Sequence, residues 1–528
     1  MNKSREPIEV GNRKQLFLDE QFFATVKGVS LTLNPPTDGG TAIRADRPWE
    51  AAGACNWCVV VPDPKLGEIK MYYETSAEIP NPAGGKPLSH RGMACAVSTD
   101  GIHWDKPDFG IHEFDGNKNN NVVLRGEQGV AGRAYDQMGS VVIDESDVPE
   151  RRYKTLFCGE NCKMRAAYSP DGIHWTVVND WKPVSEQSAD SGNIVLWDPN
   201  INRWVGYFRH WSATRLVTRV ETDDFESWPQ RTADHIVLAP DEVDTYDSML
   251  DGPFIIAGEA IDAMEGFTDT GKPYKGMRYN PDDPIEEFVW FTDDADVLDG
   301  VDFYNQPVTI YPYADNAYIM PFSPFYHKSN LIEIQLAVSR DGIQWDRPGD
   351  RQPWVRLPLE EEEIRLMFCG PGVVRDGDSL YHYYSYSKHW HGSGIPGQYE
   401  QSRPPPYSGS IRRAVLRLDG YMSADAGNQD GRFVTGPIVH NGNRLELNVD
   451  TAAGGWVQVE LLDDVATPAR GRQISGFKLE DCDPITCNST HRVVTWNGSS
   501  DVSTLAGKPI RMHVRMRNAK LYAFQFAE

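Results

Sequence analysis

The sequence predicts an all-β fold: a five-bladed β-propeller over residues 1–428, followed by a C-terminal β-sandwich over residues 429–528. Three observations predict it: a turn motif that recurs along the chain, an apolar hairpin that recurs in phase with this motif, and a change of pattern near residue 430. The 528 residues include 46 glycines and 36 prolines, and apolar residues at helical spacing are scarce. This composition is typical of short strands joined by tight turns.

The turn motif has the form S-x-D-G-I-x-W. Three copies match almost letter for letter, a fourth is looser and a fifth is degenerate; they lie at residues 98–104, 169–175, 339–345, 222–228 and 418–421. The aspartate accepts backbone N–H bonds in a tight turn, and the glycine supplies the positive φ that the turn requires. The tryptophan begins the return strand, and we expect it to wedge between neighbouring sheets.

The second marker is an apolar strand, a turn and an aromatic strand, and each copy precedes one copy of the turn motif. It occurs at residues 59–73, 141–157, 194–208, 308–320 and 373–384. One hairpin from each marker gives a four-stranded unit, and five such units predict five blades. We expect the apolar hairpins next to the propeller axis and the turn motifs at the periphery.

The spacing of the turn motifs predicts an insertion at about residues 240–301. Residues 240–302 hold 18 Asp and Glu against 3 Lys and Arg, a net charge of −15. A segment of this length is a lid, a binding loop or a solvated surface loop. Beyond residue 430, alternating runs such as Arg444–Val449 and Trp456–Leu461 predict the sandwich. Residues 15–20 are expected to add a strand or to pack on the propeller.

The charge of the chain excludes some partners. With 52 Lys and Arg against 76 Asp and Glu the net charge is −24, so neither nucleic acid nor an anionic membrane is an expected partner. No apolar run reaches the roughly 20 residues that span a bilayer. The first residues show no signal peptide, which predicts a cytoplasmic protein, or a secreted or periplasmic one if the chain was trimmed.

The chain resembles the five-bladed propeller glycosidases, which are glycoside hydrolase families 32, 43 and 68, and a bacterial group similar to family 32. The resemblance rests on the hairpin pairs, the turn motifs, the sandwich and segments such as Leu16–Asp19, Arg47–Glu50 and Leu479–Pro484. It implies a pocket at one end of the axis, a carboxyl pair, and no organic cofactor, with room for a structural Ca²⁺ near the axis. The nucleophile, R-D-P and E-C motifs of family 32 are absent from the matching places, and Glu160–Cys162 is not equated with E-C.

Candidate catalytic acids were sought just upstream of each innermost strand, because glycoside hydrolysis needs one protonated and one ionised carboxyl group. Glu50 and Asp302 are the preferred pair because each lies beside aromatic residues, which raise a carboxyl pKa and stack on sugar rings. Asp136 and Asp190 are the alternatives. Acids before strands also cap turns or pair with arginine, so a structural role is the competing interpretation for each.

Five further side chains are expected to contact the substrate: Trp49, Trp57, Tyr304, His327 and His391. No metal-ligand set is predicted; the cysteine pairs at 55/58 and 158/162 lie about 100 residues apart and are interpreted as structural thiols.

The predicted function is hydrolysis of a glycosidic bond of a furanose-type or related sugar, with an oligosaccharide or glycoside as partner. Two alternatives stay open: a lyase that uses Tyr and His in the same pocket, and a propeller that binds glycans without catalysis. Assembly as a homo-oligomer is compatible with the sequence.

Overall fold

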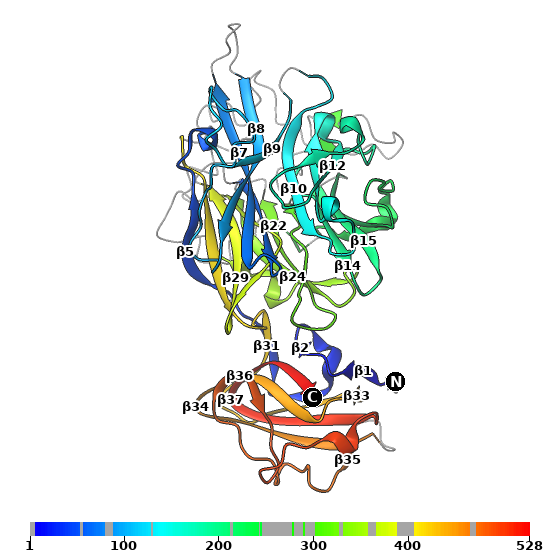
Figure 1. The fold of residues 1–528 in the computed structure, drawn as a ribbon. Coiled ribbons are helices and arrows are strands. Elements are labelled where there is room, and N and C mark those ends of the chain that lie inside the picture. Colours follow the sequence, from blue (N-terminus) through cyan, green and yellow to red (C-terminus); the bar gives the residue numbers. More distant parts are fainter. Residues whose placement is uncertain are drawn as a thin grey trace, which may run out of the picture.

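The computed structural model describes residues 6–52, 56–79, 88–127, 130–211, 215–241, 243–244, 277–278, 289–290, 301–326, 331–356, 366–387, 406–464 and 471–528. Figure 1 shows two bodies joined by a narrow waist: a larger one built from the middle of the chain and a smaller one that holds the C-terminus and lies beside the N-terminus. In the described part every helix is a three-residue 3-10 turn, so the predicted all-β class is confirmed, and none is long and apolar enough to span a membrane. These turns are η1 (Glu20–Phe22), η2 (Pro48–Glu50), η3 (Pro149–Arg151), η4 (Glu160–Cys162), η5 (Asn179–Trp181), η6 (Ala233–His235), η8 (Gly349–Arg351) and η9 (Ser503–Leu505).

The first three blades of the larger body are separate four-stranded antiparallel sheets, numbered outward from the innermost strand. Blade 1 contains β6 (Asn56–Asp63), β7 (Glu68–Ile79), β8 (Leu88–Ser98) and β9 (Val122–Arg125). Blade 2 contains β10 (Tyr135–Ile143), β11 (Tyr153–Gly159), β12 (Met164–Ser169) and β13 (Thr176–Val177). Blade 3 contains β14 (Ile194–Asp198), β15 (Arg203–Trp211), β16 (Arg215–Thr222) and β17 (Ile236–Leu238).

Blades 4 and 5 repeat this plan with interrupted strands and are linked to each other by the parallel pairing of β23 (Leu331–Ile332) with β27. Blade 4 contains β20 (Val301–Asn305) and β21 (Thr309–Ile310), then β22 (Tyr318–Tyr326), β24 (Ile334–Ser339), β25 (Trp345–Asp346) and β26 (Pro353–Val355). Blade 5 contains β27 (Leu366–Cys369) and β28 (Val374–Asp376), then β29 (Ser379–Ser387), β30 (Ser410–Arg417) and β5 (Thr37–Arg44). The predicted five-bladed propeller is therefore confirmed.

The outer strand of blade 5 comes from the start of the chain. β5 pairs antiparallel with β30, for example Ile43 with Ile411, so the ring is closed by strands far apart in sequence. Closure of this kind protects sheet edges from further pairing. Most of the predicted acidic insertion lies outside the described residues; β18 (Met277–Arg278) and β19 (Val289–Trp290) form a two-stranded pair within it.

The repeated turn motif has the local structure that its residues predict. Asp100 Oδ1 accepts the backbone N–H groups of Ile102 and His103 at 2.7 and 2.8 Å, and Gly101 has φ +71°. The same bonds recur in the other two close copies. The aspartate side chain accepts hydrogen bonds that a backbone carbonyl would otherwise accept, and this stabilises a sharp reversal of the chain on the outer side of the blade.

Each close copy of the motif also fastens its blade to the preceding one. A tyrosine hydroxyl from the second strand of the preceding blade donates to the glycine carbonyl of the turn, and the tryptophan ring meets that tyrosine edge-on. The pairs are Tyr383 with Gly101 (2.6 Å), Tyr72 with Gly172 (3.0 Å) and Tyr207 with Gly342 (2.8 Å). The expected wedge between neighbouring sheets is thus present.

The smaller body is a β-sandwich whose two longest strands bend at an irregularity between Thr451 and Trp456 and so contribute to both sheets. Its strands from the second half of the chain are β31 (Met422–Ala426), β32 (Gly431–Thr435), β33 (Ile438–His440), β34 (Arg444–Asp463), β35 (Arg472–Gln473), β36 (Asn488–Val493) and β37 (Ile510–Ala527). Its strands from the N-terminus are β1 (Ile8–Gly11), β2 (Gln15–Leu16), β3 (Phe23–Lys27) and β4 (Ser30–Leu33).

The strand pairing places the ends of the chain differently from the predicted division at residue 428. β1 to β4 and β31 pair within the sandwich, not within the propeller. The physical reason is aromatic packing: the ring of Phe17 lies 5.6 Å from that of Phe433, and the ring of Phe22 lies 5.0 Å from that of Phe524. Residues 15–20 therefore do both things that were expected of them: β2 adds a strand to the sandwich, while Leu16 and Leu18 pack into the hydrophobic core of the propeller. Asp19 forms an ion pair with Arg340 of the propeller.

Candidate active site

One end of the propeller axis gathers a side chain from each of the five blades. They are Trp57 of β6, Asp136 of β10, Asp190 just before β14, Tyr304 of β20 and Phe368 of β27. We call these residues, together with Glu74, Arg91, Arg209, Arg215 and Asp302, the axial group. Six members of the group lie on or just before an innermost strand, where the sequence predicts the pocket: Trp57, Asp136, Asp190, Asp302, Tyr304 and Phe368. The other four members lie on other strands.

Three aromatic rings form the centre of the axial group. The rings of Trp57 and Tyr304 are parallel within 3° with centroids 6.1 Å apart, and Phe368 lies 4.6 Å from Trp57. Trp57 and Tyr304 are half-buried. Trp57 has φ +46°, a backbone conformation that bulky residues seldom adopt and that tends to occur at functional sites. Half-exposed aromatic faces of this kind can stack on the apolar face of a sugar ring.

Two arginines bind two of the predicted acids and pack on the same tyrosine. Arg209 donates to Asp190, and Arg215 donates to Asp302 through its guanidinium and, at 2.8 Å, through its backbone N–H. The two guanidinium carbons lie 4.2 and 4.8 Å from the centroid of the Tyr304 ring. Cations over an aromatic face are favourable, so the two ion pairs hold Tyr304 in place.

The three axial aspartates differ in their access to solvent. The exposed fraction of the side chain is 36% for Asp136, 24% for Asp190 and 3% for Asp302. Asp136 pairs with Arg91 at 2.8 Å. Both oxygens of Asp302 accept hydrogen bonds from Arg215, so the geometry favours the partly exposed Asp136 and Asp190 over Asp302.

Glu74 is an axial acid that sequence analysis missed. It lies on β7, the second strand of blade 1, and its carboxylate accepts the backbone N–H of Met138 at 3.2 Å. Its pKa is raised from 4.5 to about 7, mainly by burial; Arg91 and the Met138 N–H oppose the shift, and the negative charges of Asp136 and Asp190 add to it. A search restricted to acids upstream of inner strands could not find it. The available signal was an acid directly after the buried run Met71–Tyr73.

The structure does not bring Glu50, the other preferred acid, to the axial group. Glu50 ends η2 on the flank of blade 1 and is fully buried. It accepts the backbone N–H groups of Asp46 and Arg47, the Tyr73 hydroxyl at 2.7 Å and the Lys106 ammonium at 2.9 Å. Its oxygens are occupied by these donors, so the competing structural interpretation fits its surroundings.

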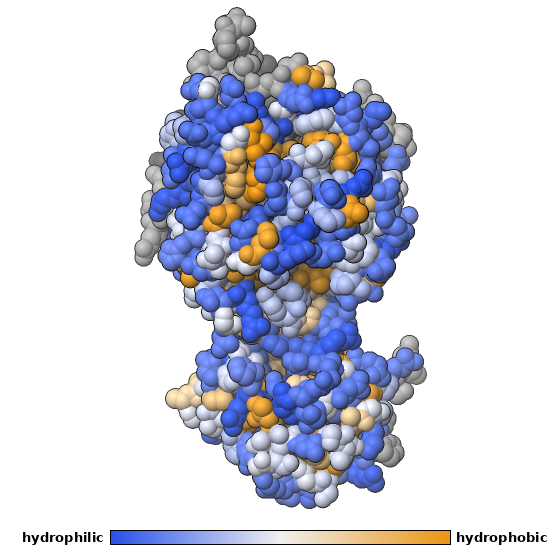
Figure 2. Space-filling view, in the orientation of Figure 1, coloured by the Kyte–Doolittle hydropathy of each residue, from blue (hydrophilic) through white to orange (hydrophobic). Residues whose placement is uncertain are grey.

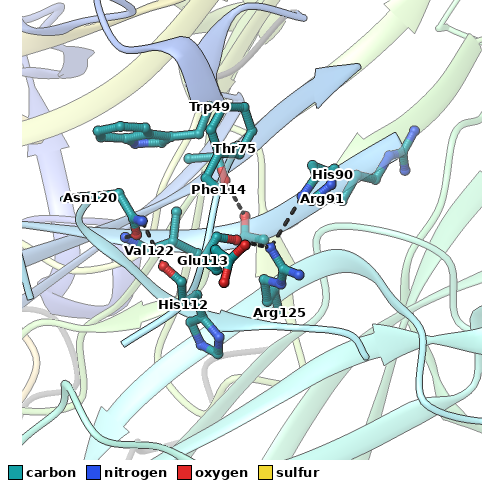
Figure 3. A pocket seen from close by; sticks show the side chains of 11 residues that line it. Trp49, Thr75, His90, Arg91, His112, Glu113, Phe114, Asn120, Val122 and Arg125 are labelled. Carbon is teal, nitrogen blue, oxygen red and sulfur yellow. Dashed lines mark hydrogen bonds between the residues drawn. The ribbon is translucent and has the colours of Figure 1, made fainter. Parts of the chain in front are cut away.

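Trp49 lies with Glu50 on the flank of blade 1, in the narrow pocket of Figure 3. Its indole N–H donates to Asn121 at 2.8 Å, and its ring meets Phe114 edge-on. His112 lines the same pocket, and burial lowers its pKa to about 4, which keeps it neutral. Trp49 therefore packs between strands of blade 1 and away from Trp57 and Tyr304, which the structure does bring together.

His327 and His391 lie outside the described residues. Among the residues that are described, no cluster of three or more His, Cys, Asp or Glu side chains could hold a metal ion.

No protein-family model matches the chain, and no curated protein matches it either. Several solved structures are similar. A thermostable family-43 glycoside hydrolase has TM-score 0.39 and 11% identity over 72% of this chain and 96% of its own. A GH130 protein described with glycoside hydrolases that target β-1,2-mannosidic linkages in Candida mannan has TM-score 0.38 and 12% identity over 78% and 99%. A fructofuranosidase from Schwanniomyces occidentalis in complex with fructosylnystose has TM-score 0.35 and 11% identity over 93% and 99%. At such identities the chemistry of this chain has to be inferred from its own residues.

Proposed function

We propose that the protein is a glycoside hydrolase that cleaves a furanose-type or related small sugar at the axial group, without an organic cofactor. The observation that carries the proposal is the combination, in one group, of an acid with a pKa of about 7 and two aspartates that are each paired with arginine. Hydrolysis of a glycosidic bond needs both protonation states at once.

The surroundings of each acid indicate whether it acts as the proton donor or as the nucleophile or base. Glu74 is buried, so near neutral pH it is partly protonated and can give its proton to the leaving-group oxygen. Asp190 forms an ion pair with Arg209, and its carboxylate serves as nucleophile or as the base that activates water. Asp136 supplies negative charge to Glu74 and holds Arg91 at the rim. Asp302 positions Arg215 under Tyr304.

The aromatic rings supply the binding surface. Trp57 and Tyr304 lie beside Asp190: a Cβ atom on Gly192 would meet Trp57 at 3.2 Å, and Arg209 joins Asp190 to the backbone carbonyl of Tyr304. A sugar ring stacked on these faces would present its anomeric carbon near the acids.

A screen of aryl glycosides and oligosaccharides with the purified chain tests the proposal. We expect turnover of at least one furanoside or related glycoside, and a loss of at least about 100-fold in Asp190→Asn. Asp223→Asn is the matched control in blade 3, because Asp223 is 79% exposed and pairs only with Arg203 at the surface.

Other results would identify the alternatives. An unsaturated sugar product would indicate a lyase, and binding without any product would indicate a glycan-binding propeller. Full activity in Asp190→Asn would remove Asp190 from the mechanism.

A further inference from the structure

A second pocket lies at the waist between the two bodies, far from the axial group in the fold. It is lined by Lys14, by Arg375 of β28 in the propeller and by residues of the sandwich strands β34, β36 and β37, and its cavity volume is about 150 Å³. Figure 2 shows the waist that separates the two bodies. Because both domains contribute to its wall, a molecule bound here would bridge them.

The basic side chains of this junction pocket include one without an acidic partner. Arg375 donates from Nε to the carbonyl of Gly377 at 2.9 Å and packs 5.2 Å from the centroid of Tyr313, and it forms no ion pair with any described acid. The ends of its guanidinium group thus remain available as a fork of N–H donors. Such a fork matches a carboxylate in a bidentate arrangement.

Two acids near the pocket have cationic partners, and a third, Asp378, accepts from the Thr490 hydroxyl at 2.7 Å. Asp419 is fully buried and accepts hydrogen bonds from Lys14 at 2.8 Å, Tyr311 at 2.7 Å and Asn448 at 2.9 Å. Glu446 accepts from Arg444 at 2.7 Å. Of the two cations in the pocket wall, Lys14 is paired with Asp419 and Arg375 forms no described ion pair, in a chain whose overall charge is −24.

The rest of the wall suits a small hydroxylated ring. Leu418, Leu447 and Phe524 lie behind the wall, each at most 2% exposed, so the surface that a ligand meets is mostly polar. At the rim, His491 bonds to Thr490 through Nδ1 at 2.9 Å, which leaves Nε2 for a ligand hydroxyl. A mostly polar wall can form hydrogen bonds with the hydroxyl groups of a sugar.

We propose that the junction pocket binds a sugar acid, with the carboxylate on Arg375 and hydroxyl groups at His491. The site is separate from the axial group, so it does not depend on the proposed function. Binding across two domains stabilises their junction, because a ligand that binds only the folded state raises the unfolding free energy.

The test is titration calorimetry of the full chain with D-galacturonate, with D-galactose as the neutral probe and acetate as the carboxylate alone. We expect D-galacturonate to bind at least about tenfold more tightly than either and to raise the melting temperature. Arg375→Gln should weaken D-galacturonate binding at least about tenfold, since it removes the charged fork. Arg375 is exposed, so this variant should fold.

Three controls make the outcome decisive. Arg432→Gln changes an exposed arginine elsewhere in the sandwich and should leave binding unchanged. His491→Ala should weaken binding of D-galacturonate but not of acetate. Asp190→Asn, in the axial group, should leave binding unchanged. The proposal is overturned if D-galactose binds as tightly as D-galacturonate, if Arg375→Gln binds normally, or if only Asp190→Asn loses binding.

Discussion

Blade 1 has two buried glutamates, Glu50 and Glu74, and their surroundings differ. On the flank, Glu50 accepts hydrogen bonds from two backbone N–H groups, a tyrosine hydroxyl and an ammonium group. Towards the axis, Glu74 accepts one backbone N–H and faces the charges of Asp136 and Asp190. Burial is common to both, so burial alone does not mark a catalytic acid. The number of donors and the sign of the nearby charges separate a structural carboxylate from a reactive one.

The largest expected effect is on stability at the flank. Glu50→Gln leaves the Lys106 ammonium, which is 9% exposed, without its buried counter-charge. We expect the unfolding free energy to fall by about 3 kcal/mol, measured by urea denaturation, with normal turnover per folded molecule. The double variant with Lys106→Met should recover part of the loss. Unchanged stability together with lost turnover would return Glu50 to the catalytic candidates.

The next effect is on turnover at the axis. Glu74→Gln keeps the shape and the acceptor for the Met138 N–H but removes the proton that can be transferred. We expect kcat/KM to fall at least about 100-fold, or about 2.7 kcal/mol, while the melting temperature stays the same or rises. Glu78→Gln, on the same strand but exposed, is the control. Equal activities in Glu74→Gln and Glu78→Gln would show that Glu74 is not the catalytic acid.

A smaller effect concerns the contact between blades. Gly172 has φ +79°, and a Cβ atom there would lie 2.3 Å from the Tyr72 hydroxyl of the preceding blade. Gly172→Ala should lower the unfolding free energy by about 2 kcal/mol. Gly116→Ala has the same backbone strain at φ +80° with nothing within 4 Å, and it should cost about 1 kcal/mol. Equal losses of unfolding free energy in both variants would show that the contact between Tyr72 and the Gly172 turn adds no stability beyond that of the turn itself.

The smallest effect is on pH dependence. Because the folded pKa of Glu74 is raised from 4.5 to about 7, the folded state binds more protons than the unfolded state between these values. Its contribution to stability is therefore complete below pH 4.5 and declines as the pH rises towards 7. Activity should decline on the alkaline side of pH 7 as the acid loses its proton. In Glu74→Gln, the pH dependence of stability should be absent when the melting temperature is measured across pH, and so should the alkaline decline of activity when turnover is measured across pH. A pH dependence that persists in this variant belongs to another group.

The blades could be predicted because their signals are contiguous in sequence. The Asp100 turn is stabilised by the N–H groups of Ile102 and His103, two and three residues further on, so its sequence alone encodes its shape. The candidate site could be predicted only in part. Trp57, Asp136, Asp190, Asp302 and Tyr304 follow from their positions at inner strands, and the structure places all of them in the axial group.

The sequence by itself determined the number of blades, the outward order of the strands and the end of the axis where acids gather. The tertiary structure decided which acids are free to react. Glu50 acquires its donors from Lys106 and Tyr73, and Glu74 acquires its raised pKa from burial in the fold and from the charges of Asp136 and Asp190, which lie more than 60 positions away. The closure of blade 5 by β5 and the recruitment of residues 8–33 to the sandwich were likewise decided by distant partners. The physical reason is that turns depend on neighbours in the chain, whereas protonation and strand pairing depend on whatever the fold brings within a few ångströms.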